Sequence, residues 1–389
     1  MQKIIALIFL ITAISLPAQQ PVGAQVQPPV LKALPLGGDD DIVSRPLPDD
    51  LPDVPPLAPE AQPATPIPSS VQISPLDIKP TGDDALRLQI FLDEAMFGPG
   101  VIDGKPGHFT ELAVQSWNEV NGHPLEDWVA ANSAARKAIP DPLAVAVVPD
   151  FVKDWVDPNL PTKYELQAKK KRMSYRSVAE FMAERYHSDY AYLLTLNDAK
   201  KINKLKARDS IIVPNVTPFC IEKITGMKHE AEEALSQRHV VVNTKINQAR
   251  IFEAAPAALV VEEPGVSAPV IRANRGLVAS FPITPGQPQF IKFGTWELRN
   301  MIELPNWRYD KQLLKTGKRS KDSLNIPPGP NSPVGVIWNG LSKPGIGMHG
   351  TSNPETIGRA RSAGCIRLAN WDAIRLPLLI RPGTTVEIR

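Results

Sequence analysis

The pattern of hydrophobic positions predicts helices in the first half of the ordered sequence and strands in the second. Apolar side chains recur at helical spacing in two stretches, which carry Leu88, Phe91, Leu92 and Ala95, and then Ala113, Val114, Trp117 and Val120. We expect Asp83 and Asp84 to cap the first helix and Thr110 to cap the second. Residues 82–138 are therefore predicted to form a small helical module.

A second small module is predicted over residues 173–216. Ser177 and Glu180 have the spacing of a capping box, and Phe181 and Met182 follow as inward-facing residues. A second short helix carries Tyr190, Leu193, Leu194 and Leu196. After a charged turn, the β-branched run 211–214 predicts a strand.

From residue 239 onward the apolar positions have the short, turn-bounded runs of β-strands. The expected strands are residues 239–242, 249–252, 259–261, 276–281, 294–298, 334–338 and 384–388. Residues 262–275 are longer than a hairpin requires and are expected to form a surface excursion. The predicted fold class is thus multidomain α+β, in which a mostly antiparallel β domain spans residues 239–389.

The 41 prolines of the 389-residue chain are concentrated near its start, because fifteen of them lie between Pro21 and Pro80. Residues 25–81 are therefore expected to be a disordered, semi-rigid tether, and residues 139–172 a second linker with proline at both ends. The first residues, Lys3 followed by an apolar run and small residues, predict a signal peptide over 1–24. A retained N-terminal anchor is the alternative, and would be the protein's one link to the membrane.

The balance of charge and the expected export limit the possible partners. A net charge of +2 gives no electrostatic reason to expect nucleic acid binding. The basic run 169–172 is expected to be a solvated face. The signal peptide places the mature protein outside the cytoplasmic membrane, in the periplasm or cell envelope.

His349 and Cys365 are the residues best suited to covalent chemistry. A cysteine with a neighbouring histidine can carry an acyl group, and an imidazolium would lower the thiol pKa toward neutral pH. In an oxidising compartment the alternative for Cys365 is a disulfide with Cys220, the other cysteine of the chain. A zinc site is not expected, because too few Cys and His residues lie nearby to supply four ligands.

The residues around Cys365 supply the other parts that acyl transfer needs. Gly364 allows backbone N–H groups to approach a substrate carbonyl as an oxyanion hole, and Ser362 offers a further donor. Arg367 is expected either to orient a substrate carboxylate or to pair with Asp372.

The whole C-terminal pattern resembles the catalytic domain of the L,D-transpeptidases, which have the YkuD-type fold. The matching motifs are Met348-His349-Gly350-Thr351, Ile357-Gly358, Ser362-Ala363-Gly364-Cys365-Ile366-Arg367, Asn370 and Asp372. The resemblance covers residues 239–389 and implies a β-sandwich-like sheet with Cys365 as nucleophile and His349 as proton acceptor and donor. Where the family often has a second histidine before the Gly-Cys pair, this chain has Ala363.

The resemblance also implies the reaction. Cys365 would attack a peptidoglycan tetrapeptide stem, and a second stem's amine would resolve the thioester into a 3–3 cross-link, with no cofactor or metal. Gly350 would support the oxyanion together with Gly364 and Ser362, and Arg367, Thr351 and Met348 would bind substrate. Alternatives are an L,D-carboxypeptidase, a transferase that attaches protein to the wall, and a non-catalytic wall-binding scaffold.

The two N-terminal modules have resemblances of their own. Residues 82–138 resemble a helical peptidoglycan-binding module through the Pro-Gly-Val-Ile-Asp-Gly turn at residues 99–104 and the helix that follows. Residues 173–216 resemble a LysM-like glycan-binding module. Both resemblances imply attachment to the cell wall, and a generic two-helix unit is the alternative for the first module.

Overall fold

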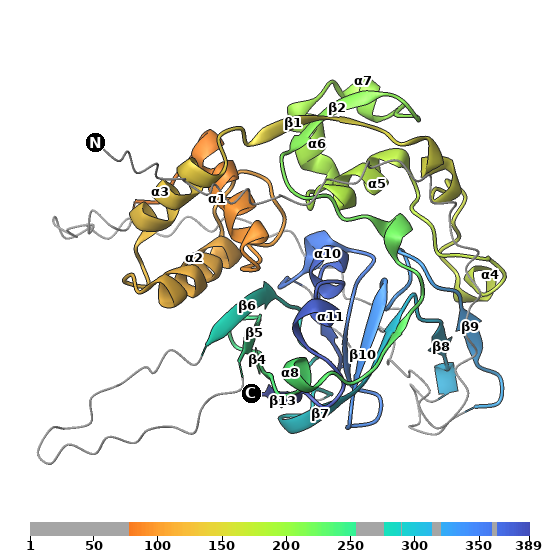
Figure 1. Cartoon of the computed structure of the whole chain (residues 1–389). Helices are drawn as coiled ribbons and strands as arrows, with labels where there is room; N and C mark the ends of the chain where they lie inside the picture. Colours follow the sequence, from red (N-terminus) through yellow and green to blue (C-terminus); the bar gives the residue numbers. More distant parts are fainter. Residues whose placement is uncertain (1–77, 254–275, 289, 313–319, 360–363) are drawn as a thin grey trace, which may run out of the picture. The chain divides into compact units, whose positions relative to one another are not determined.

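The computed structural model describes residues 78–253, 276–288, 290–312, 320–359 and 364–389 (Figure 1). The first three helices form a group, shown in orange and amber in Figure 1: α1 (Gly82–Glu94), α2 (His108–Asn121) and α3 (Trp128–Ala138). Leu88, Leu92 and Trp117 are among the buried residues that hold this group together. The helical character predicted for residues 82–138 is therefore confirmed.

The starts of the first two helices differ from the prediction. Thr81 occupies the cap position of α1, and Asp83 and Asp84 lie in its first turn, where carboxylates stabilise the positive end of the helix dipole. Helix α2 begins at His108 after Gly107, so Thr110 lies inside the helix and is buried. Sequence identified the correct region, but the caps lie two to three residues earlier.

In the next part, five short helices lie in sequence between two paired strands. Its strands are β1 (Leu143–Val147) and β2 (Ser210–Pro214), and its helices are η2 (Asp150–Asp154), α4 (Tyr164–Gln167), α5 (Val178–Arg185), α6 (Tyr190–Leu196) and α7 (Ala199–Ile202). One half of the expected capping box is present, because the Glu180 N–H donates to Ser177 Oγ at 3.0 Å, while the Glu180 carboxylate accepts from the N–H of Arg176, one residue before the cap.

Residues 139–172, expected to be a linker, differ from that prediction. Strand β1 lies in this range and pairs antiparallel with β2, with Val145 opposite Ile212. The continuous apolar run of Leu143–Val147 supplies a strand, and the prolines on either side end it rather than prevent it.

The C-terminal part is built on one nine-stranded sheet, coloured green to blue in Figure 1. Its strands are β3 (Lys228–His229), β4 (His239–Asn243), β5 (Gln248–Phe252), β6 (Leu277–Pro282), β7 (Gly294–Glu303), β10 (Ile337–Leu341), β11 (Gly347–His349), β12 (Ile366–Arg367) and β13 (Thr385–Ile388). They are ordered β12-β11-β10-β7-β13-β4-β5-β6, and β3 pairs with β7. A separate pair is formed by β8 (Trp307–Tyr309) and β9 (Leu324–Ile326).

The sheet curls, where two packed sheets were expected. Thr284, which follows β6, forms an antiparallel bridge with Arg367 of β12, so the two ends of the strand order come together. Register shifts at Ile251/Phe252 and Gly340/Leu341 bend the strands that lie between. Most pairs are antiparallel as predicted, while β11–β12 and β13–β4 are parallel.

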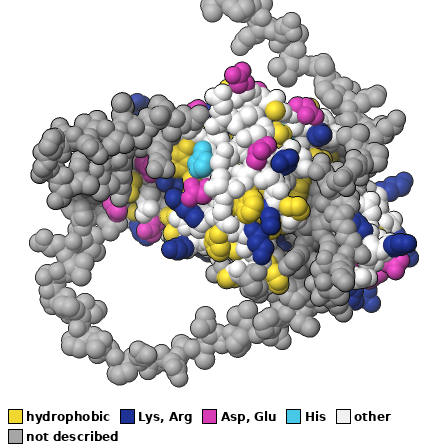
Figure 2. All heavy atoms as spheres, turned by 90° about the horizontal axis from the view of Figure 1, so that it is seen from below, with side chains coloured by type: hydrophobic (Ala, Val, Ile, Leu, Met, Phe, Trp, Pro, Cys, Tyr) yellow, Lys and Arg dark blue, Asp and Glu magenta, His cyan; other side chains and the backbone are white. Residues whose placement is uncertain are grey.

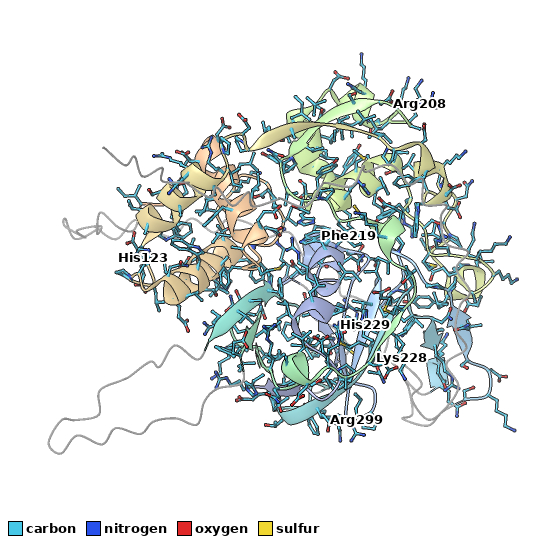
Figure 3. All side chains as sticks on the ribbon, viewed as in Figure 1. His123, Arg208, Phe219, Lys228, His229 and Arg299 are labelled. Atoms are coloured by element: carbon cyan, nitrogen blue, oxygen red, sulfur yellow. The ribbon has the colours of Figure 1, made fainter. Side chains whose placement is uncertain are left out.

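Short helices complete the C-terminal part: η3 (Ile221–Lys223), α8 (Glu233–Ser236), η4 (Pro354–Thr356), α10 (Asn370–Ala373) and α11 (Leu376–Leu379). Figure 3 labels Phe219, Lys228 and His229 along the segment that leads into and forms β3. His229 Nε2 lies 2.9 Å from Glu303 Oε1 of β7, which fastens this segment to the sheet.

One predicted strand is shifted. Residues 334–338 were expected to be extended, but β10 begins at Ile337, because Gly335 has a left-handed φ of 61° and belongs to a turn. The signal peptide, the tether up to residue 77, the strand at 259–261 and the excursion 262–275 lie outside the described residues. Within the described ranges, no helix has the length and apolar character needed to cross a membrane.

A buried ionic cluster joins the N-terminal and C-terminal halves. Asp93 of α1 accepts from Arg375 at 2.6 Å and lies 3.0 Å from His187 Nδ1. Burial opposes ionisation of Asp93, but the charges of Arg375 and His187 and the hydrogen bonds from both outweigh it together and hold the Asp93 pKa below its usual range. Nearby, Phe97 forms a parallel bridge with Ser280 of β6, and Gly98 N donates to Ser280 O at 2.7 Å.

Side chains of both signs are interspersed on the face drawn in Figure 2, among hydrophobic and uncharged groups. This mixture agrees with the small net charge of +2.

We expect Asp93→Ala to lower the free energy of unfolding by about 3–5 kcal/mol, because it leaves the Arg375 guanidinium buried without its main partner. Asp84→Ala, on the same helix but paired with the partly exposed Arg87 and Arg136, is the matched control and should cost much less. Urea denaturation at pH 7 measures both. Equal losses for the two variants would contradict a special role of the buried cluster.

Candidate active site

The pairing of β11 with β12 brings His349 and Cys365 to one face of the sheet. The two strands are parallel, with Met348 opposite Ile366 and His349 opposite Arg367. Side chains alternate between the faces of a strand, so Cys365, two residues before Arg367, shares the face of His349. The register therefore places on one face of the sheet the two residues that the sequence singled out.

His349 is buried and oriented from two sides. Its exposed fraction is 2%, and its ring stacks on Trp338 of β10 with the centroids 5.5 Å apart. His349 Nδ1 lies 2.7 Å from the Gly350 carbonyl oxygen, which accepts a hydrogen bond when that nitrogen carries the proton. This arrangement leaves Nε2 as the nitrogen with a lone pair, which is the form a general base requires.

Asn370 packs tightly against the backbone next to His349. A Cβ atom at Gly350 or at Gly335 would collide with Asn370 Oδ1, so glycine is required at both positions. The same oxygen accepts from the Val336 N–H at 3.2 Å. Gly350 is thus held in place by a side chain of α10.

Cys365 lies immediately before β12 in an apolar environment. Its exposed fraction is 4%, and it belongs to a hydrophobic cluster with Trp338, Leu160 and Met173. The thiol donates to the Gly345 carbonyl at 3.6 Å. No disulfide joins it to Cys220, so the structure does not support that alternative for Cys365.

Burial keeps both groups neutral at pH 7. Burial raises the pKa of the Cys365 thiol to about 11, although the Gly347 N–H and the charge of Arg367 favour the thiolate. Burial, helped by the positive charge of Arg367, lowers the pKa of His349 to about 3. In this structure His349 therefore does not lower the Cys365 pKa as an imidazolium, because burial makes the imidazolium costly to desolvate.

The remaining predicted site residues differ in how far the structure supports their expected roles. Gly364 has a φ of 148°, a conformation that favours glycine, and this orients the backbone just before Cys365. Thr351 is buried, and its hydroxyl accepts from the Asn353 N–H at 3.3 Å. Met348 points to the opposite face and packs in the hydrophobic core with Ile366, so its predicted substrate contact is not supported. Ser362 and Ala363 lie outside the described residues.

Arg367 is the charged group of the site. It shares the sheet face of His349, and its backbone is fixed by hydrogen bonds to Thr284 at 2.9 and 3.0 Å. Burial lowers the Arg367 pKa, while Cys365 and Tyr164 raise it, so both lie close to the guanidinium. Asp372 instead lies 3.6 Å from Arg375. The expected pairing of Arg367 with Asp372 is therefore not seen, and its other expected role, orientation of a substrate carboxylate, stays a prediction.

Three neighbours of the site were missed from the sequence: Tyr164, Trp338 and Glu184. Tyr164 of α4 packs its ring on Trp307 and Tyr309, at centroid distances of 5.3 and 4.4 Å. Strand alternation places Trp338 opposite His349 only once the pairing of β10 and β11 is known. Among the described residues, no cluster of His, Cys, Asp and Glu could hold a metal ion.

Comparison with known proteins finds a family that matches the part of the chain that carries this site. Residues 266–388 match the family model of the L,D-transpeptidase catalytic domain, YkuD. A Bacillus licheniformis protein that bears the name L,D-transpeptidase YkuD is 42% identical over 78 residues, which are 20% of this chain and 47% of that protein. Its Bacillus subtilis counterpart is 46% identical over 65 residues, 17% of this chain and 40% of that protein. The chain therefore matches less than half the length of either relative.

Solved structures that also bear the name L,D-transpeptidase align with lower sequence identity. L,D-transpeptidase 3 from Mycobacterium tuberculosis is 16% identical, with a TM-score of 0.27 over 39% of this chain and 61% of that one. An L,D-transpeptidase from Mycobacterium smegmatis is 14% identical, with a TM-score of 0.27 over 39% of this chain and 58% of that one. Alignments with TM-scores this low carry no argument about the site.

We expect alkylation of Cys365 by iodoacetamide to accelerate about tenfold per pH unit between pH 7 and 10, because only the thiolate reacts and its fraction grows in that proportion below a pKa of about 11. A Cys220→Ser background isolates the site thiol, and mass spectrometry of the labelled peptide measures the rate. A rate that is constant between pH 6 and 8 would instead indicate a preformed thiolate.

Proposed function

We propose that the protein is an L,D-transpeptidase acting on peptidoglycan stem peptides, because residues 266–388 match the family model of the L,D-transpeptidase (YkuD) catalytic domain. The observation that carries the proposal is the placement of His349 and Cys365 on one face of the sheet by the β11–β12 register. The proposed products are 3–3 cross-links in the cell wall.

In the proposed acylation step, the Cys365 sulfur attacks the carbonyl carbon of the L,D peptide bond that precedes the terminal D-Ala of a tetrapeptide stem. His349 Nε2 takes the thiol proton as the carbon–sulfur bond forms, because Nδ1 is engaged with the Gly350 carbonyl. Backbone N–H groups at Gly364 and Cys365 stabilise the oxyanion. The C–N bond then breaks, and His349 returns the proton to the leaving D-Ala amine.

In the second step, an amine from another stem peptide attacks the thioester and His349 takes its proton. The carbon–sulfur bond breaks, the new peptide bond completes the cross-link, and the proton returns to Cys365. The neutral starting pair suits this scheme, since a neutral imidazole is the form that accepts a proton. Opening of the site to substrate reverses part of the burial that raises the thiol pKa.

The other residues take supporting roles in the proposal. Arg367 binds a carboxylate of the donor stem, while Gly350 and Thr351 shape the turn beside His349. We further propose that residues 82–138 and 173–216 hold the enzyme to the glycan, the second as a LysM-like module, and that the protein works in the cell envelope. No cofactor enters the scheme.

The test is to incubate the protein with disaccharide-tetrapeptide and to identify products by mass spectrometry. We expect dimer and free D-Ala from the wild type, no dimer from Cys365→Ala, and a loss of at least about 100-fold in rate for His349→Ala. Cys220→Ser is the matched control and should keep full activity.

Three other outcomes would contradict the proposal in different ways. Tripeptide without dimer would identify an L,D-carboxypeptidase. Product that appears only when a protein amine is added would identify a transferase that attaches protein to the wall. No turnover by folded wild-type protein that still binds peptidoglycan sacculi would identify a non-catalytic scaffold.

A further inference from the structure

The side-chain carboxyl group of Glu184 is buried outside the catalytic domain and is hydrogen-bonded to a residue of that domain. Glu184 lies on α5, with an exposed fraction of 5%. Its Oε1 accepts from Asn370 Nδ2 at 2.8 Å, and its Oε2 accepts from the Tyr175 hydroxyl. Glu184 and Asn370 are 186 residues apart, so this contact joins two separately predicted parts of the chain.

The amide of Asn370 has all its polar atoms engaged. Besides Glu184, Nδ2 donates to the Pro330 carbonyl at 3.2 Å, and Oδ1 accepts from the Val336 N–H at 3.2 Å. Asn370 Oδ1 lies so close to Gly335 and Gly350 that neither of these residues could carry a Cβ atom. The direction of this amide is therefore set jointly by Glu184 and by the catalytic domain.

The position of Gly350 in turn decides the orientation of His349. The Gly350 carbonyl is the group 2.7 Å from His349 Nδ1, so a shift of this peptide weakens the hydrogen bond that selects the Nδ1-protonated tautomer. A continuous path thus runs from Glu184 through Asn370 and Gly350 to His349. Each link is a hydrogen bond or a close contact between buried groups.

We propose that Glu184 is a positioning residue for His349, so that the module containing α5 is a working part of the catalytic site as well as an attachment module. The proposal rests on the proposed acyl-transfer function, because positioning matters only if His349 is the base. It predicts that docking of α5 onto α10 is needed to hold the imidazole in its reactive tautomer.

The free-energy cost of burying the Glu184 carboxyl group supports a specific role for this residue. Burial raises the Glu184 pKa to about 8, with further contributions from the nearby carboxyl groups of Glu180 and Glu355, while hydrogen bonds from Tyr175 and Asn370 act in the opposite direction. An apolar side chain at this position would avoid that desolvation. Helix α5 already has a full apolar face in Ala179, Phe181 and Met182, so Glu184 is not needed to bury it.

The central experiment compares three variants in the full chain. Glu184→Ala removes the acceptor of Asn370 and should lower kcat for cross-linking about tenfold or more with KM nearly unchanged, which corresponds to about 1.4 kcal/mol or more. Glu184→Gln keeps an acceptor for Asn370 and should remain within about threefold of wild type. Tyr175→Phe removes the other partner of Glu184 but leaves the Asn370 bond, and should also remain close to wild type.

Glu222→Ala is the matched control for general loosening of the module. Glu222 pairs with Arg185 on the same helix and does not contact Asn370. Circular dichroism confirms that each variant is folded at the assay temperature. A double-mutant cycle of Glu184→Ala with Asn370→Ala should show a non-additive loss of kcat, because both changes cut the same path.

A second readout does not depend on the substrate. Nitrogen-15 spectra of the imidazoles, with His349→Ala used for assignment, should show the Nδ1-protonated tautomer in the wild type and in Glu184→Gln, and a mixture of tautomers in Glu184→Ala. Unchanged His349 signals in Glu184→Ala, or equal losses of kcat in Glu184→Ala and Tyr175→Phe, would overturn the positioning role. If the wild type turned over no stem peptide, the proposed function would fail, and the imidazole spectra would still decide the positioning role.

Discussion

The two-residue parallel pairing of β11 with β12 is the contact on which the rest of the site depends. It places Cys365 on the face of His349 and turns Met348 and Ile366 into the core. A slip of one residue would exchange these faces, because successive side chains of a strand alternate. So short a ladder cannot fix its own register. The bridge from Arg367 to Thr284 and the packing of Asn370 against Gly350 fix it from both sides.

The sequence was sufficient to select His349 and Cys365 as the candidate reacting pair, but not to predict their electrostatic state. The His-Gly-Thr and Gly-Cys motifs identify His349 and Cys365 because those residue types carry the chemistry themselves. Their pKa values depend on burial, which arises from elements as distant as Leu160 and Met173, and no local pattern encodes it. The role of Met348 could have been corrected from alternation alone, since it neighbours His349 on a strand. Glu184 could not have been found, because its partner Asn370 is 186 residues away.

The elements of the fold could also be predicted from the sequence, while their arrangement could not. Long periodic stretches such as α2 and β4 were located within a few residues, since their patterns are local. The assignment of residues 139–172 as a linker failed because the prolines were given more weight than the apolar run that forms β1. The single curled sheet was not foreseen, because it depends on a bridge between Thr284 and Arg367 that joins the ends of the strand order. Local patterns thus identified the elements, and contacts between distant residues decided their arrangement.

The bridge between Phe97 and Ser280 has a consequence for the behaviour of the protein at high concentration. Strand β6 ends the strand order, and the outer edge of such a strand offers unpaired N–H and C=O groups to any other extended chain. Residues 96–98 occupy part of this edge, since the Ser280 N–H donates to the Met96 carbonyl and the Ser280 carbonyl accepts from Gly98. The helical module therefore shields the sheet from edge-to-edge association with other molecules. That protection against aggregation is a benefit of the module that does not depend on any ligand it binds.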